Sequence, residues 1–178
     1  MENLNNLNLI VKCADFAAIK HKDQRRKDEF ATPYINHPIG VAYYLTDNGV
    51  TDPNVIMAAL LHDTVEDTDT TLEEIEKEFG KEVAGIVDEV SDDKSLPKAE
   101  RKRLQVVHAP HKSHSAKLVK LADKLYNCSD LERATPKGWP VERVEGYVAW
   151  SKQVVDGMRG TNKGLEKLLD ELFARHGL

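Results

Sequence analysis

The sequence predicts an all-α fold. Apolar residues recur three and four positions apart along most of the chain, which is the spacing of a helix with one buried face. Proline or a short polar residue stands where several of these segments begin, as helix N-termini prefer. The strict alternation of apolar and polar residues that marks a half-buried β-strand is not found in the sequence. We therefore expect a compact helical bundle.

Each predicted helix follows from its own pattern. The first ends before a charged stretch, Lys22–Asp28, that is typical of a solvated loop. Asp52 and Pro53 open a central helix as N-cap and first position, and Thr71 with Glu74 forms a capping box. The expected helices are the N-terminal segment to about His21, segments starting at Pro38 and Pro53, Leu72–Phe79, Val83–Val90, Lys98–Val107, Ser115–Arg133, Val141–Met158 and Leu165–Phe173.

Composition limits the possible functions. Of 178 residues, 40% are hydrophobic and 31% are charged, which is ordinary for a globular protein, and we expect one domain spanning residues 1–178. The formal net charge of −5 argues against a general nucleic-acid binder. A local basic pocket can still hold a phosphorylated small molecule in an acidic protein.

The sequence also indicates a cellular compartment. Cys13 and Cys128 are the only cysteines, and their spacing fits neither a disulfide framework nor a zinc site. The longest apolar run is far too short to span a membrane, and the N-terminus lacks the pattern of a secretion signal. We therefore expect a cytoplasmic protein without a membrane partner. The oligomeric state stays open.

The segment His62–Asp67 is the central functional candidate. It follows the apolar run Val55–Leu61, so groups able to bind a metal or move protons emerge where burial stops. If the helix continues, Glu66 and Asp67 lie one turn beyond the His-Asp pair. The pair can then hold a metal while the two acids face its water. The alternative is a helix end with solvated acids after a core histidine.

Two further residues complete a candidate metal site. His37 and Asp123, together with His62 and Asp63, make a set of two imidazoles and two carboxylates. Such a set suits Mn²⁺, Fe²⁺ or Zn²⁺, and the lack of a thiolate disfavours a structural zinc. On a six-coordinate ion, two positions remain for water or a phosphate oxygen. Asp123 could instead be a buried acid paired with a lysine.

Other polar clusters are set aside as ligands. Acids in a turn are more often solvated or capping, and we expect this of Asp92 and Asp93. Pro110 breaks the helix that would align three histidines around it, and no acids accompany them. We expect these histidines at the surface: His108, His111 and His114.

Four segments together give a more specific signal. They are Arg26–Lys27, Tyr34–Pro38, His62–Thr68 and Leu121–Asn127, and in this order they resemble the HD-domain phosphohydrolases. Within that group the chain is similar to the hydrolase domain of the RelA/SpoT family, and more narrowly to small alarmone hydrolases of the metazoan SpoT-homologue type. The likeness covers about residues 10–175. It implies a helical bundle of the HD-domain type and no synthetase or regulatory domain.

The resemblance implies an activity and its central residues. The activity is removal of the 3′-pyrophosphate from guanosine 3′,5′-bis(diphosphate), ppGpp, with Mn²⁺ as the cofactor. Glu66 and Asp67 match an acid pair that positions or deprotonates the water, so that a metal-bound hydroxide attacks the 3′-linked phosphorus. The residues that match the metal ligands are His37, His62, Asp63 and Asp123.

It also implies substrate contacts. These are Arg26 and Lys27 at the nucleotide, Asn127 beside the ribose, and Lys98, Arg143 and Tyr147 at the phosphate end. One departure is Asp130, because the family often has threonine at that position. An acid there adds negative charge near a polyanion, so we expect no close substrate contact at Asp130.

Other functions remain open at this stage. The same site could remove the 2′-phosphate of NADPH, since that substrate also places a phosphate on a ribose. The protein could also be a non-catalytic module that senses a nucleotide, although a sensor has no need of the acid pair. A purely structural helical protein is the third alternative.

Overall fold

The computed structural model describes residues 2–178, and side chains from Asn5 onward. Expectations for Met1 and for the side chain of Leu4 therefore lie outside the described residues. The helices are α1 (Glu2–Lys20), α2 (Asn36–Asp47), α3 (Pro53–Leu61), α4 (Thr64–Asp67), α5 (Leu72–Phe79), α6 (Lys81–Val90), α7 (Lys98–His108), the 3₁₀ helix η1 (Ala109–His111), α8 (His114–Arg133), α9 (Val141–Asp156) and α10 (Lys163–Arg175).

The predicted all-α class is confirmed. Within residues 2–178 every regular element is helical, and the β-bridge between Arg25 and Pro33 is isolated in a loop. No helix in this range is both long enough and apolar enough to cross a membrane. The expected helix limits agree with the observed ones to within two residues, except that α3 stops at Leu61 although the central helix was expected to continue through His62–Asp67.

Two predicted helix starts are confirmed at atomic detail. The Asp52 side chain accepts a hydrogen bond of 2.9 Å from the backbone N–H of Asn54, and Thr71 accepts one of 3.2 Å from the N–H of Glu74. The predicted start of α2 at Pro38 is wrong by two residues, since α2 begins at Asn36. Pro38 fits there because N–H groups of the first helical turn have no partner within the helix.

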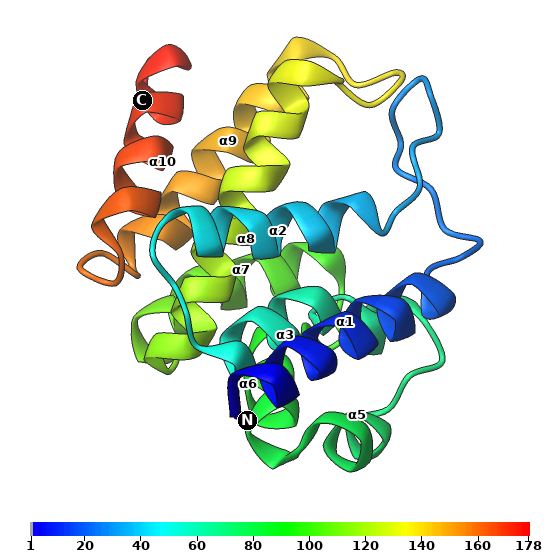
Figure 1. Cartoon of the computed structure of the whole chain (residues 1–178). Helices are drawn as coiled ribbons and strands as arrows, with labels where there is room; N and C mark the ends of the chain where they lie inside the picture. The colour runs from blue at the N-terminus through cyan, green and yellow to red at the C-terminus, as the bar shows by residue number, and fades with distance from the viewer. Residues whose placement is uncertain (1) are drawn as a thin grey trace.

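The core forms around α3 and α8. Every residue from Val55 to Leu61 in α3 is buried, and α3 packs against α1, α2, α6 and α8. α8 in turn packs against α2, α6, α9 and α10, as Figure 1 shows. Burying a large aliphatic side chain contributes about 1.5–3 kcal/mol. Two of the three helices that position the candidate metal ligands, α3 and α8, therefore lie in the middle of the core.

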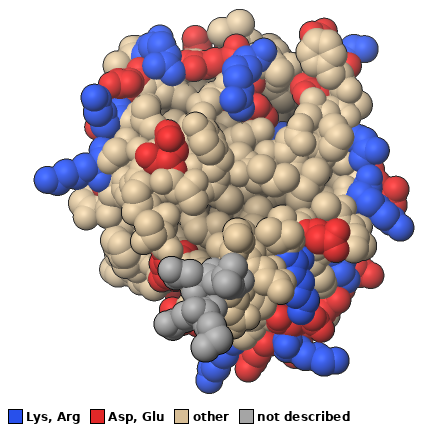
Figure 2. Space-filling view, in the orientation of Figure 1, with Lys and Arg blue, Asp and Glu red and all other residues tan. Residues whose placement is uncertain are grey.

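The face of the molecule shown in Figure 2 has few charges at its centre. Lysine, arginine, aspartate and glutamate side chains gather mainly around its edge, with both signs intermixed. Among the described residues visible there, the view shows no continuous basic stripe of the kind that nucleic-acid binders present.

Candidate metal centre and active site

Three helices bring the four predicted ligands together. His37 lies in the first turn of α2, His62 and Asp63 follow the last residue of α3, and Asp123 lies in the middle of α8. The two imidazole Nε2 atoms are 3.2 Å apart. Oδ2 of Asp63 lies 3.3 and 3.1 Å from Nε2 of His37 and His62, and Oδ1 of Asp123 lies 3.3 and 3.7 Å from the same atoms. The predicted convergence is thus present in the fold.

The hydrogen bonds of His62 show that this cluster is built for a cation. Its Nδ1 lies 2.7 Å from the backbone oxygen of Ala59, so Nδ1 carries the hydrogen and a neutral ring presents a lone pair at Nε2. That lone pair faces Nε2 of His37 and two carboxylates. Burial lowers the pKa of His62, but Asp63 and Asp123 outweigh this and raise it to about 10. The two carboxylates therefore favour a positive charge among these four side chains, on a bound cation or on His62 itself.

The donor set fits a divalent metal ion. Bonds of about 2.0–2.2 Å to nitrogen and oxygen place neighbouring ligand atoms roughly 3–3.5 Å apart, and the separations given above lie in or close to this range. His37, His62 and Asp123 form a buried group whose ligand atoms all lie within 4.8 Å of one another. Burial opposes charge on Asp63, but the two imidazoles outweigh it and hold its pKa well below the usual range.

Neighbouring side chains orient both carboxylates. The Tyr34 hydroxyl donates to Oδ2 of Asp63 at 2.6 Å. The Asn127 amide donates to Oδ1 of Asp123 at 2.7 Å, and the buried Lys124 ammonium donates to its Oδ2 at 3.1 Å. Contacts of this kind fix which oxygen faces an ion and strengthen its binding.

A break in the helix, which we did not predict, separates α3 from the acid pair Glu66 and Asp67. α3 ends at Leu61, and the Thr64 hydroxyl donates to the Leu61 oxygen at 2.7 Å. The expectation of one continuous helix through His62–Asp67 is therefore wrong. α4 follows at once, and the N–H of Asp67 still donates to the oxygen of Asp63 at 2.9 Å. The acids thus stay about one turn beyond the ligands.

The two acids differ in their surroundings. Glu66 Oε1 accepts a hydrogen bond of 2.6 Å from the N–H of Asp92, and burial raises the pKa of Glu66 to about 7 although that bond lowers it. Asp67 accepts from Gln24 at 3.0 Å and from Lys94 at 2.6 Å. A carboxyl that titrates near neutral pH is suited to proton transfer.

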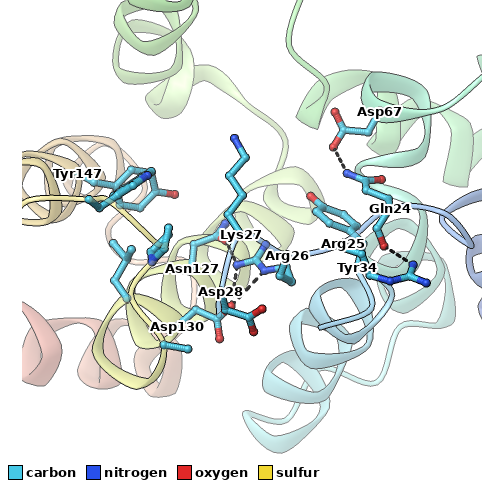
Figure 3. A pocket seen from close by; sticks show the side chains of 14 residues that line it. Gln24, Arg25, Arg26, Lys27, Asp28, Tyr34, Asp67, Asn127, Asp130 and Tyr147 are labelled. Carbon is cyan, nitrogen blue, oxygen red and sulfur yellow. Dashed lines mark hydrogen bonds and ion pairs between the residues drawn. The ribbon is translucent and has the colours of Figure 1, made fainter. Parts of the chain in front are cut away.

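A cavity of about 390 Å³ adjoins the cluster. Tyr34, Asp67 and Asn127 line it and also lie at the metal ligands or the acid pair. Figure 3 shows Lys27 extending between Tyr147 on one side and Asp67 on the other. The remaining lining comes from residues 24–28, Asp130, Leu131, Ala134, Pro136, Trp139 and Tyr147. Its size lies within the range of about 300–1,000 Å³ that small-molecule pockets occupy.

Comparisons with known proteins agree with this geometry. The family model described as HD domain matches residues 13–145. Two curated relatives, each named guanosine-3′,5′-bis(diphosphate) 3′-pyrophosphohydrolase MESH1, are 62% identical. The one from Xenopus tropicalis matches over 96% of each chain, and the one from Homo sapiens over 95% of each chain. A solved structure described as a metazoan orthologue of SpoT that hydrolyses ppGpp has a TM-score of 0.93, with 54% identity over 96% of each chain.

The chain belongs to the HD-domain family, in its MESH1-type group.

Most predicted substrate residues of this HD-domain protein line the cavity. Arg26, Lys27, Asn127 and Tyr147 do so, and Arg26 donates to the Asn127 side chain at 3.0 Å. Lys98 and Arg143 are two exceptions. Lys98 is exposed on α7, and neither Lys98 nor Arg143 is part of the cavity wall.

Arg143 still lies close to the cavity wall. Its guanidinium is 4.1 Å from the ring centroid of Trp139, which does line the cavity. Contact with a ligand in the cavity therefore requires either a ligand that extends past Trp139 or a movement of the arginine.

Asp130 departs from our expectation, because it does line the cavity. Its carboxylate pairs with Arg26 and with Arg133, each at 2.7 Å. Two guanidinium groups thus offset its charge, which reduces the repulsion that we expected it to exert on an anionic ligand.

The residues set aside as ligands are largely as expected. His108, His111 and His114 are exposed, although they lie at helix ends and in η1 rather than in a loop. Asp93 accepts a hydrogen bond of 2.9 Å from the N–H of Ser95, as a turn acid does. Asp92 departs from the expectation, because it is half-buried and its Oδ2 accepts a hydrogen bond of 2.6 Å from the Gln105 amide. Its N–H also donates to Glu66.

Some residues of this HD-domain site were missed. Tyr34 lies in a segment that carried the resemblance, so its position one turn before His37 was an available signal. Gln24 and Lys94, which hold Asp67, come from loops and had no such signal. Trp150 had no such signal either. The ammonium groups of Lys102 and Lys124 lie 4.3 and 4.6 Å from the centroid of its ring.

Proposed function

We propose that this protein is a metal-dependent pyrophosphohydrolase that converts ppGpp and water to GDP and pyrophosphate. The observation that carries the proposal is the convergence of His37, His62, Asp63 and Asp123 beside a nucleotide-sized cavity. It occurs in a chain that is 55–62% identical, over nearly its whole length, to relatives named as guanosine-3′,5′-bis(diphosphate) 3′-pyrophosphohydrolases. We take residues 1–178 as one catalytic domain.

We propose Mn²⁺ as the ion, held by these two imidazoles and two carboxylates. Their mixed nitrogen and oxygen donors, without thiolate, support this choice over a structural zinc. A divalent ion bound there lowers the pKa of a bound water and polarises a phosphate oxygen. The chain contributes the orientation of its ligands through Tyr34, Asn127 and Lys124.

The proposed reaction balances as follows. The oxygen of water forms a bond to the 3′-linked phosphorus, and the bond between this phosphorus and the ribose 3′-oxygen breaks. Glu66 or Asp67 accepts the proton from the water, and the 3′-oxygen leaves with a proton. Raising the pKa of Glu66 to about 7 makes it a base that can take up this proton near neutral pH.

We assign substrate binding to cations around the cavity. Arg26 and Lys27 offset phosphate charge in the cavity, and Asn127 contacts the ribose. Lys98 and Arg143 are assigned to the far phosphate end together with Tyr147, whose ring lies 6.3 Å from that of Trp139. Charge-assisted hydrogen bonds from such groups explain how a protein of net charge −5 can bind a polyanion.

The experiment is product analysis with purified protein, ppGpp and Mn²⁺. The wild type is expected to release GDP and pyrophosphate, and Asp63→Ala is expected to release neither. Full activity of Asp63→Ala with metal supplied would contradict the proposal. Tight ppGpp binding by the wild type without product would indicate a nucleotide sensor instead.

A second candidate is a phosphatase that acts on the 2′-phosphate of NADPH. The observation that favours it is the aromatic end of the cavity, where Trp139 and Tyr147 offer faces on which a second ring system can stack. A comparison of kcat/KM for ppGpp and NADPH on the same preparation decides between the two substrates.

We further propose that the protein acts in the cytoplasm on small molecules and not on nucleic acid or membranes. The net charge of −5 supports this proposal, and so do Cys13 and Cys128, which are free thiols and form no disulfide. Fractionation of cells with an antibody to the protein would test the location.

A further inference from the structure

The side chain of Asp67 is held on both oxygens. Oδ2 accepts a hydrogen bond of 3.0 Å from the Gln24 amide, drawn as a dashed line in Figure 3. Oδ1 accepts one of 2.6 Å from the Lys94 ammonium. The Asp67 side chain is 23% exposed, so without these contacts it could turn toward solvent. Its direction is therefore set by residues outside the His62–Asp67 segment.

The orientation of Gln24 is set in turn by a buried histidine. His21 is 2% exposed, and its Nδ1 lies 2.7 Å from Oε1 of Gln24. A glutamine amide has one accepting and one donating end, so an Nδ1–H donor on His21 directs the donating end to Asp67. The backbone fixes Gln24 as well, because its N–H donates to His21 and its oxygen accepts from Tyr34, at 2.9 and 3.1 Å.

The same histidine also touches the metal side of the site. Its ring lies 4.9 Å from the ring of Tyr34, tilted by 37°, and the Tyr34 hydroxyl donates to Asp63. Within the part of the chain that the structure describes, Nε2 of His21 is buried without a hydrogen-bond partner. A buried polar ring with one unsatisfied nitrogen is costly in a core. Among the described residues, the hydrogen bond of Nδ1 to Gln24 is the one that satisfies this ring.

We propose that His21 and Gln24 are positioning residues that aim the Asp67 carboxylate at the attacking water. His21 orients the Gln24 amide, and the Gln24 amide orients Asp67. This inference rests on the proposed function, because it assigns Asp67 a part in proton transfer. Gln24 lines the cavity, but its amide donates to Asp67, so in this role the loss of either residue acts through the position of Asp67.

The first test uses Gln24→Leu, which keeps the size of the side chain and removes both of its polar ends. With saturating Mn²⁺ and ppGpp, kcat is expected to fall about 10- to 100-fold, as removal of an orienting contact typically does. Mn²⁺ affinity is expected to stay within about threefold, because Gln24 does not contact a proposed ligand. Lys22→Ala, an exposed change in the same loop, is the matched control and should leave both values unchanged.

The second test separates positioning from general loop structure. If Gln24 acts only through Asp67, the double variant Gln24→Leu with Asp67→Asn loses no more kcat than Asp67→Asn alone. His21→Leu should lower kcat as Gln24→Leu does, whereas His21→Asn, which can keep a donor near the Nδ1 position, should restore most of it. Effects that add to those of Asp67→Asn, or that appear only in KM or metal affinity, overturn the proposal.

Failure of the proposed function gives a different pattern. If the wild type does not release pyrophosphate from ppGpp, the function is wrong whatever the variants do. The positioning role then has a readout that needs no substrate, which is the direction of Asp67 in crystal structures of the Mn²⁺-loaded wild type and Gln24→Leu. An Asp67 side chain that keeps its direction without Gln24 overturns the inference.

Discussion

The hydroxyl of Tyr34 donates a 2.6 Å hydrogen bond to Oδ2 of Asp63, the same oxygen that lies 3.1 Å from Nε2 of His62. Burial, followed by the negative charge of Asp63 and the hydrogen bond to it, raises the pKa of the Tyr34 hydroxyl above its usual range. The phenol therefore stays protonated and remains a donor at all ordinary pH values. One tyrosine thus fixes the orientation of a proposed metal ligand from outside the cluster.

Tyr34→Phe is expected to weaken Mn²⁺ binding about 10- to 100-fold, because the orienting bond to Asp63 is lost while the ring remains. Calorimetric titration of metal-free protein with Mn²⁺ measures this without substrate. Tyr43→Phe is the control, since Tyr43 is a 61% exposed tyrosine on α2. Equal affinities for the wild type and Tyr34→Phe would show that Asp63 does not need the contact.

Gly40→Ala is expected to destabilise the fold by about 1–3 kcal/mol, as overpacking of a filled core does. A methyl group on Gly40 would overlap the ring of Tyr126, which packs α8 against α2. Gly146→Ala in α9 is the matched control, because nothing lies within 4 Å of the added carbon. There alanine should stabilise by about 0.5–1 kcal/mol through its helix propensity. Urea unfolding measures both, and a neutral Gly40→Ala would contradict the close packing.

The sequence predicted the elements whose signals are local. N-caps such as Asp52 and Thr71 act within three residues, so their pattern is readable without the fold. The break after Leu61 was missed because it depends on one side-chain bond, from Thr64 to a backbone oxygen, in a segment where the helical pattern continues. The predicted start of α2 at Pro38 was two residues late, because proline is tolerated throughout the first turn of a helix.

The candidate site was predictable only where a motif marked it. His37 and Asp123 are far apart in sequence, and the resemblance, not their spacing, paired them with His62. The residues that hold Asp67 and the aromatic side chains around Trp139 depend on how loops fold over the cavity. Periodicity says nothing about such loops. Lys98 and Arg143 are the opposite case. The resemblance implied them as substrate contacts, but they are not part of the cavity wall.

Removal of the metal is expected to lower Tm. An ion that binds only the folded state adds about 2.7 kcal/mol at a concentration of 100 Kd, which corresponds to roughly 5–10 °C for a chain of this length. Thermal melting with Mn²⁺ and with excess chelator measures the difference, and Asp63→Ala should lose the dependence. A chelator-insensitive Tm in a protein that carries no metal would favour a purely structural role.

Three of the assigned cations, Arg26, Lys98 and Arg143, should differ in their effect on KM. Arg26→Ala is expected to raise KM for ppGpp about 10- to 100-fold, because a charge-assisted hydrogen bond in a half-buried cavity contributes roughly 1.5–3 kcal/mol. Lys98→Ala and Arg143→Ala should change KM by less than about fivefold, since ion contacts at exposed side chains contribute only about 0.2–1 kcal/mol.

Steady-state kinetics at fixed ionic strength would measure these values, with Lys81→Ala at the start of α6 as a control outside the cavity. Larger effects of Lys98→Ala and Arg143→Ala than of Arg26→Ala would show that the substrate extends beyond the cavity and that the proposed phosphate end is the main anchor.

Glu66 gives the reaction a predicted pH dependence. Burial raises its pKa to about 7, and a base acts only when deprotonated, so kcat should rise with pH through about 7 and be lost below it. A bound cation favours the carboxylate, which would move this acidic limb of the pH profile of kcat to lower pH. Glu66→Gln should remove the limb together with most of the activity, whereas a limb that persists in Glu66→Gln would assign the base to Asp67.

The same shift predicts a stability change of known sign. The folded pKa of Glu66 lies above the value of about 4.3 expected for an unfolded chain, so between these values the folded state binds more protons. The contribution of Glu66 to the free energy of unfolding therefore falls as pH rises from about 4.5 to 7 and stays lost above it. Urea unfolding of metal-free protein at pH 5 and pH 8 should show Glu66→Gln gaining stability relative to the wild type at the higher pH. An unchanged difference between the two proteins would mean that Glu66 is not held in a desolvated environment.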